Sequence, residues 1–222
     1  MKRDIRQLIR DKSEWTEPLS ESDKSPGFRG WHSRGYLPHF DAPGLLQMIT
    51  YRLHDAMPAN RRHEWAELLK IEDERERRTK VEAYLDAGHG ECHLRRPEIA
   101  SVIQENLLYF DGTRYRLLAW VVMPNHVHAL IEMRETPMAA VVRSWKSFTA
   151  NEANRLLGRA GTFWQPEYFD RYIRDEEHLG KAIRYIENNP VKAGLARLPE
   201  EWIFNGAYFR SRGRNVDTLS TS

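Results

Sequence analysis

The 222-residue sequence is poor in cysteine, in long apolar runs and in net charge. Its single cysteine, Cys92, excludes an internal disulfide and favours a reducing compartment. No apolar run approaches the ~20 residues of a membrane-spanning helix, and the charged N-terminal segment has no apolar core of signal-peptide length. We therefore expect a cytoplasmic protein that does not use a membrane.

The charge balance does not by itself indicate a nucleic-acid-binding protein, because 34 Lys and Arg oppose 32 Asp and Glu for a net charge of +2. A DNA site must therefore come from local clustering. Basic and aromatic residues alternate in two stretches, and such sets suit phosphates and unpaired bases. The candidate DNA contacts in these stretches are Arg143, Lys146, Arg171 and Arg174. We interpret Trp145 and Phe148, which alternate with the first pair, as core residues of an amphipathic helix.

Two histidines stand two positions apart in VVMPNHVHALIEM. His126 and His128 alternate with an apolar series, so a strand here places both imidazoles on one side and the apolar side chains on the other. The apolar series is Val127, Ala129, Ile131 and Met133. Two imidazoles on an open strand face make half of a metal site, although the same spacing is also typical of half-buried strand histidines.

A tyrosine follows about sixty positions later in KAIRYIENNPVKAGL. Apolar residues recur there at helical spacing, which places Tyr185 and Asn189 one turn apart at the edge of the buried stripe. Tyr185 is the candidate nucleophile, with Tyr168 and Tyr172 as alternatives. For Asn189, a helix C-cap before Pro190 is the alternative to a ligand role.

The remaining pattern predicts one α+β domain, a sandwich of helices against an antiparallel sheet. The expected order is a strand from Leu45, a charged helical block, a helix from Pro97, a hairpin turning at Pro124-Asn125, a helix from Met138, an edge strand near TFWQP, and a last helix. We divide the chain into a polar arm (1–33), the domain (34–208) and a polar tail (209–222). Within the domain, a charged helical insertion at about 58–90 is interpreted as a solvated surface.

Four stretches in this order resemble the REP-associated tyrosine transposases, which are HUH single-strand DNA transposases with one catalytic tyrosine. The stretches are RGYLPHF from Arg34, MPNHVH from Met123, FWQPEYFDRYIRD from Phe163 and YIENNPVKAGL from Tyr185. The resemblance spans most of the chain. It implies a ferredoxin-like or RRM-like core, the HUH endonuclease core, with the histidines on a central strand.

The resemblance also implies roles for residues and partners. Tyr185 would attack a phosphodiester and form a 5′-phosphotyrosine, while His126, His128 and Asn189 would hold Mg²⁺ or Mn²⁺. Ligand preference alone equally admits Zn²⁺. Arg34 would help to grip the foot of a REP-type DNA hairpin in a single strand, and the protein would act as a monomer. The alternatives are a domesticated hairpin-binding protein without catalysis and a metal-dependent hydrolase without a covalent stage.

Overall fold

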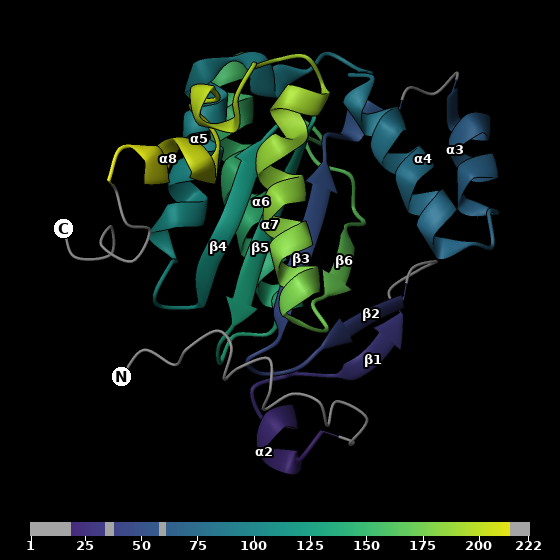
Figure 1. Cartoon of the computed structure of the whole chain (residues 1–222), viewed down its shortest axis with the longest axis vertical. Coiled ribbons are helices and arrows are strands. Elements are labelled where there is room, and N and C mark those ends of the chain that lie inside the picture. The colour runs from purple at the N-terminus through teal and green to yellow at the C-terminus, as the bar shows by residue number, and fades with distance from the viewer. Residues whose placement is uncertain (1–18, 34–37, 58–60, 214–222) are drawn as a thin grey trace.

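The computed structural model describes residues 19–33, 38–57 and 61–213 (Figure 1). Its centre is a four-stranded sheet with the spatial order β4-β5-β3-β6, in which all neighbouring strands are antiparallel. The strands are β3 (Leu46–Arg52), β4 (Tyr115–Val122), β5 (His126–Met133) and β6 (Phe169–Tyr172). Helix α5 (Pro97–Tyr109) connects β3 to β4, and α6 (Met138–Leu157) connects β5 to β6. Helix α7 (Glu176–Lys192) follows β6.

Each helical connection joins two parallel strands that have one strand between them. Strands β3 and β4 both run antiparallel to β5, and β5 and β6 both run antiparallel to β3. This is the βαββαβ arrangement of a ferredoxin-like domain. The predicted α+β sandwich with an antiparallel sheet is therefore confirmed.

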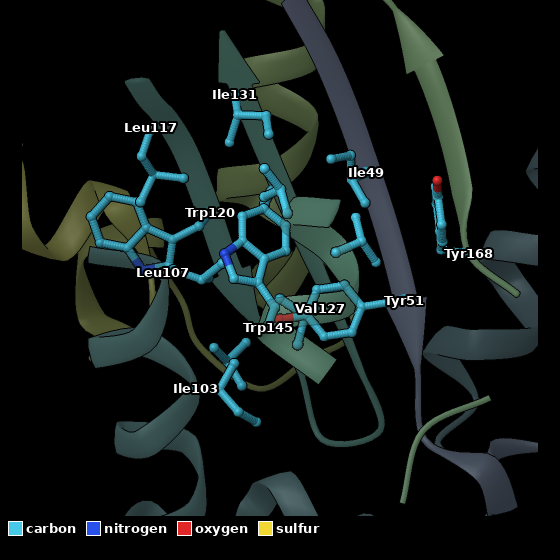
Figure 2. Packing of buried hydrophobic residues seen from close by; sticks show 14 of the residues in the cluster. Ile49, Tyr51, Ile103, Leu107, Leu117, Trp120, Val127, Ile131, Trp145 and Tyr168 are labelled. Carbon is cyan, nitrogen blue, oxygen red and sulfur yellow. The ribbon is translucent and has the colours of Figure 1, made fainter. Parts of the chain in front are cut away.

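The two faces of the sheet have different covers. Helices α5 and α6 pack on one face, and α7 crosses in front of the other (Figure 1). The α5/α6 face holds the larger apolar core, in which Trp120, Trp145 and Tyr51 are almost completely buried (Figure 2). Each such side chain contributes on the order of 1.5–3 kcal/mol when it leaves water. Most of the stability therefore comes from this face, and the α7 face can accommodate polar groups.

Helix α6 buries a stripe that advances by three or four residues per step. Its members are Met138, Val141, Val142, Trp145, Thr149 and Ala153. The interpretation of Trp145 as core is confirmed, but that of Phe148 is wrong, because Phe148 is 51% exposed. Thr149 takes the next core position, where its hydroxyl donates to the Trp145 carbonyl at 2.6 Å and leaves Phe148 outside the stripe.

The part of the expected N-terminal arm that the structure describes contains regular structure. Helix α2 (Glu21–Lys24) precedes β1 (Gly30–Ser33), which pairs with β2 (Pro38–Asp41) in a two-stranded antiparallel sheet. The rings of Trp31 and Phe40 lie opposite each other across this pair, with centroids 4.9 Å apart. Backbone pairing and this ring contact order the end of the arm, so the predicted boundary at residue 33 falls inside a hairpin.

Two features near the C-terminus also differ from expectation. Trp164 makes only an isolated bridge to Leu53, and the edge strand is β6, beyond Pro166, which has no N–H for a ladder. Helix α8 (Gly206–Ser211) runs past the predicted boundary at 208. The side chain of Phe209 holds this helix on the core. It is 8% exposed, and its ring centroid lies 5.4 Å from that of Trp120.

The charged block contains two helices, α3 (Arg62–Leu69) and α4 (Glu74–Asp86), as the periodicity predicts. We call residues 61–92 the α3–α4 excursion. Exposed pairs such as Lys80 with Glu76 occur on its outer side. Its inner side is not the solvated surface that was expected, because four apolar side chains form a small core of their own there. These are Trp65, Val81, Tyr84 and Leu85.

None of the helices in the described ranges is long and apolar enough to cross a membrane.

Candidate active site

His126 and His128 lie next to each other on the α7 face of β5. Their neighbours Val127 and Ala129 point into the α5/α6 core, as the alternation predicts. The histidines are 0% and 1% exposed, so α7 turns the expected open face into a buried one. Their Nε2 atoms face each other at 3.1 Å.

The Nδ1 atom of each imidazole has a partner. His126 Nδ1 lies 2.8 Å from Asn125 Oδ1, and the Asn125 amide nitrogen donates to the backbone carbonyls of Leu85 and His89, each at 3.2 Å. Because that nitrogen is committed as a donor, Asn125 Oδ1 accepts from His126 Nδ1–H. His128 Nδ1 lies 2.7 Å from the hydroxyl of Thr50, which is opposite it in the β3–β5 register. Such outer partners fix the orientation of metal-binding histidines and leave Nε2 as the ligand atom.

Both imidazoles are neutral near pH 7. Burial lowers the pKa of His126 to about 3, and the positive charges of Arg52 and Lys192 act in the same direction. Burial also lowers the pKa of His128 well below its usual value, with His126 and Lys192 as further causes. Neutral imidazole is the form that binds metal.

Tyr185 and Asn189 come from α7. Asp175 caps the N-terminus of this helix, and its side chain accepts from His178 N–H at 2.7 Å. The ring of Tyr185 is half-buried and lies against that of His128, with centroids 5.4 Å apart and planes at 73°. Asn189 is 0% exposed, and neither atom of its amide has a hydrogen-bond partner within the described residues. A buried amide in this state costs stability unless a group from outside the chain satisfies it.

The C-cap alternative for Asn189 is wrong. Helix α7 continues through Pro190 to Lys192, and the Asn189 carbonyl accepts from Ala193 N–H at 3.0 Å. Its side chain is therefore a member of the buried stripe of α7 and not of a helix end.

These residues fit a divalent ion. Two nitrogen ligands at bond lengths of about 2.0–2.1 Å from one ion are roughly 3 Å apart when their bonds meet at 90–109°, and the two Nε2 atoms are 3.1 Å apart. The amide of Asn189, buried without a hydrogen-bond partner within the described residues, is the candidate third donor from α7. No group of three His, Cys, Asp or Glu side chains suited to a metal occurs in the part of the chain that the structure describes. The third ligand here would accordingly be the amide.

Lys192 adds a positive charge at the same end of α7. Its Nζ lies 5.9 Å from the centroid of the Tyr185 ring and 3.0 Å from Oδ2 of Asp86, at the end of α4. The sequence interpretation missed Lys192, although positions 185, 189 and 192 are spaced as one face of a helix. It also missed the Thr50 contact, which only strand pairing reveals.

The alternative tyrosines lie on the other side of the sheet. Tyr168 is 2% exposed in the α5/α6 core, with its ring 4.9 Å from that of His39. Tyr172 packs on the same core beside Phe40, at 5.6 Å between ring centroids. Neither tyrosine is on the face of the histidines.

The predicted DNA contacts fall in several places. Arg34 lies outside the described residues. Arg143 and Lys146 line a pocket of about 350 Å³ between α6 and residues 161–168, away from the histidines. The Lys146 ammonium donates to the Pro166 carbonyl at 2.8 Å, and also to that of Gln165, so part of its hydrogen-bonding capacity serves the protein.

The two arginines near β6 differ from each other. Arg171 is opposite Met48 in the sheet register, and Met48 packs against the α7 core, so Arg171 shares the face of the histidines. Arg174 is exposed, with its guanidinium 5.4 Å from the centroid of the Tyr172 ring.

The chain is similar to known transposases over part of its length. Residues 95–189 match a family described as "Transposase IS200 like". A REP-associated tyrosine transposase of Escherichia coli is 28% identical over 91 residues, and a putative one of Haemophilus influenzae is 26% identical over 102 residues. Each alignment covers 41% of this chain. They span 53% and 58% of the relatives, a little over half their length.

A solved structure described as a REP-associated tyrosine transposase bound to a REP hairpin is 19% identical, with a TM-score of 0.46. That match covers 86% of this chain and 90% of the other. The family match ends at Asn189 and contains both histidines and Tyr185. The resemblance to REP-associated tyrosine transposases that the sequence motifs indicate is confirmed.

Proposed function

We propose that this chain is a metal-dependent single-strand DNA endonuclease and strand transferase. Residues 95–189 match the IS200-like transposases, and REP-associated tyrosine transposases are among the chain's relatives. The substrate would be a single strand folded into a REP-type hairpin. The contact between Tyr185 and His128 supports this most directly, because it brings a phenol beside a metal-binding pair of imidazoles. A phosphate near the pair would lie within reach of the phenol oxygen.

Tyr185 is the nucleophile in this proposal. Its oxygen bonds to phosphorus as the bond from phosphorus to the 3′-oxygen breaks, which leaves a 5′-phosphotyrosine and a free 3′-hydroxyl that receives a proton. A second 3′-hydroxyl attacks the same phosphorus in the reverse sense and releases the tyrosine. The phosphodiester energy is kept in the covalent bond, so rejoining needs no ATP.

The side chains around Tyr185 prepare the phosphate and the phenol. His126, His128 and Asn189 would hold a divalent ion, Mg²⁺ or Mn²⁺, which when bound supplies Lewis-acid polarisation of the phosphate. A free phenol has a pKa of about 10, so attack at neutral pH benefits from nearby positive charge. Lys192, with its Nζ 5.9 Å from the Tyr185 ring centroid, provides such a charge. Arg171 shares this face and is our candidate for a flanking phosphate contact.

The experiment is an incubation of the protein with an end-labelled hairpin oligonucleotide, with Mn²⁺ or with chelator, followed by a denaturing gel. We expect a labelled band that migrates with the protein and appears only with metal. Cleavage without this band would favour the hydrolase, and binding without cleavage would favour the domesticated hairpin-binding protein. On this proposal the protein acts in the cytosol, where its DNA lies. That the protein acts as a monomer stays a prediction.

A further inference from the structure

The connection between β3 and α5 is far longer than a ferredoxin-like fold requires. Residues 53–96 separate the two elements, whereas strand-to-helix loops commonly have about 2–6 residues. Most of this length is the α3–α4 excursion. Its base is tightly closed, because Asp55 accepts from Glu91 N–H at 2.8 Å. A Cβ on Gly90 would also lie 2.5 Å from the Asp55 carbonyl oxygen, so only glycine fits there.

The excursion contacts the half of the site that lies on β5. The carbonyls of Leu85 and His89 both accept from the amide nitrogen of Asn125, whose oxygen accepts from His126 Nδ1–H. These carbonyls decide which way the amide points. With the amide reversed, its NH₂ group would donate to His126 Nδ1, and the proton would move to Nε2, the atom that faces His128. The excursion therefore selects the form of His126 that can bind a metal.

The excursion also contacts the half of the site on α7. Asp86, the last residue of α4, pairs with Lys192 at 3.0 Å, and the Asp86 side chain is only 12% exposed. Lys192 lies one helical turn from Asn189 and beside the Tyr185 ring. This ion pair therefore holds the C-terminal end of α7, which carries Tyr185 and Asn189, against the end of α4.

A third contact fixes the excursion on the sheet. The indole of Trp65 covers the guanidinium of Arg52, which lies 4.1 Å from its centroid. Arg52 is opposite His126 in the β3–β5 register, and it is also 5.2 Å from the ring centroid of Phe169 on β6. Burial of the indole and the cation–π contact hold α3 against β3, the strand that pairs with the histidine-bearing strand β5.

We propose that the α3–α4 excursion is a positioning element of the active site: through Asn125 it orients His126, and through Asp86 it holds the end of α7 that bears Tyr185 and Asn189. This inference rests on the proposed function. Asn125 and Asp86 are positioning residues, because each acts through another side chain and neither needs to touch DNA.

The first test uses metal-free and Mn²⁺-loaded protein without DNA. In Asn125→Ala, we expect the Mn²⁺ affinity measured by electron paramagnetic resonance to fall by about tenfold. The ¹⁵N shifts of His126 in the metal-free protein should show loss of the Nδ1–H tautomer. Glu76→Ala removes an exposed pair on the same helix α4 and is the matched control, with unchanged affinity and shifts. Wild-type affinity and tautomer in Asn125→Ala would overturn the proposal, as would a wild type that binds no Mn²⁺.

The second test uses Asp86→Asn, which keeps the shape of the side chain and removes its charge. At saturating hairpin and Mn²⁺, we expect the single-turnover rate of covalent attachment to fall by about fivefold with an unchanged half-saturating DNA concentration. A wild-type rate would overturn this half of the proposal. If the wild type forms no covalent complex but the Asn125→Ala result holds, the proposed reaction fails and the positioning of His126 stands.

Discussion

The ring of Tyr185 meets the ring of His128 edge to face, with centroids 5.4 Å apart, and this contact joins α7 to the central strand β5. It also joins residues that are 57 positions apart in the sequence. The proposed nucleophile and the proposed metal-binding pair come from different layers, so their relative placement depends on how α7 packs. Ile186, which is 0% exposed next to Tyr185, belongs to the apolar cluster under α7 that also contains Leu130 and Val121.

We predict that Tyr185→Phe abolishes covalent DNA attachment and leaves hairpin affinity within about twofold of wild type. Only the hydroxyl is removed, so the ring contact with His128 remains while the nucleophile is lost. The measurement is the covalent band on a denaturing gel, with binding followed by fluorescence anisotropy. Tyr172→Phe, on the far face of the sheet, is the matched control and should react at the wild-type rate. A covalent band in Tyr185→Phe would assign the nucleophile to another tyrosine.

The sequence predicts the strand that holds the histidines and the helix that holds Tyr185, because both depend on local periodicity. It does not predict that His126 and His128 are buried, since the cover comes from α7, which packs on them only in the folded chain. Lys192 and Asp86 form an ion pair although they are more than one hundred positions apart in the sequence. Local periodicity cannot predict a pair at that separation. The position of Phe148 was missed for another reason, since Thr149 competes for the same core position.

We predict that His126→Ala combined with His128→Ala removes Mn²⁺ binding and cleavage together, while the protein still folds. Most of the apolar core lies on the other face of β5, so the fold survives the loss. The free energy of unfolding should fall by about 1–3 kcal/mol, because the Thr50 hydroxyl loses its buried partner and a cavity forms under α7. Calorimetry with chelator measures the stability. Full cleavage activity in the double mutant would contradict the metal site.

We predict that the metal-free protein loses stability as the pH falls from about 6.5 toward 3. The pKa of His126 is lowered to about 3 in the folded state, whereas an unfolded histidine has a pKa of about 6.5. In this window the unfolded chain binds more protons, so the free energy of unfolding falls with acid. The loss at pH 5 should be on the order of 2 kcal/mol from this residue, because the site is fully buried.

The measurement for this pH effect is urea unfolding at pH 7.5 and at pH 5.0 in chelator. In His126→Gln, which keeps a polar group of similar size, the pH slope should decrease. An equal slope in wild type and variant would assign the acid sensitivity to other groups.

We predict that Arg143→Ala and Lys146→Ala, at neighbouring positions on α6, both weaken DNA binding but differ in their effect on stability. If the pocket that they line holds a backbone phosphate, Arg143→Ala should weaken binding to all hairpin sequences and reduce the salt slope by about 0.7, the value for one phosphate contact on a single strand. Lys146 holds the Gln165 and Pro166 carbonyls, so Lys146→Ala should also lower the thermal midpoint. Arg155→Ala is the matched control, because Arg155 pairs with Glu152 on the same helix. Titrations at several salt concentrations measure the slope, and a wild-type slope in Arg143→Ala would remove this pocket from the DNA path.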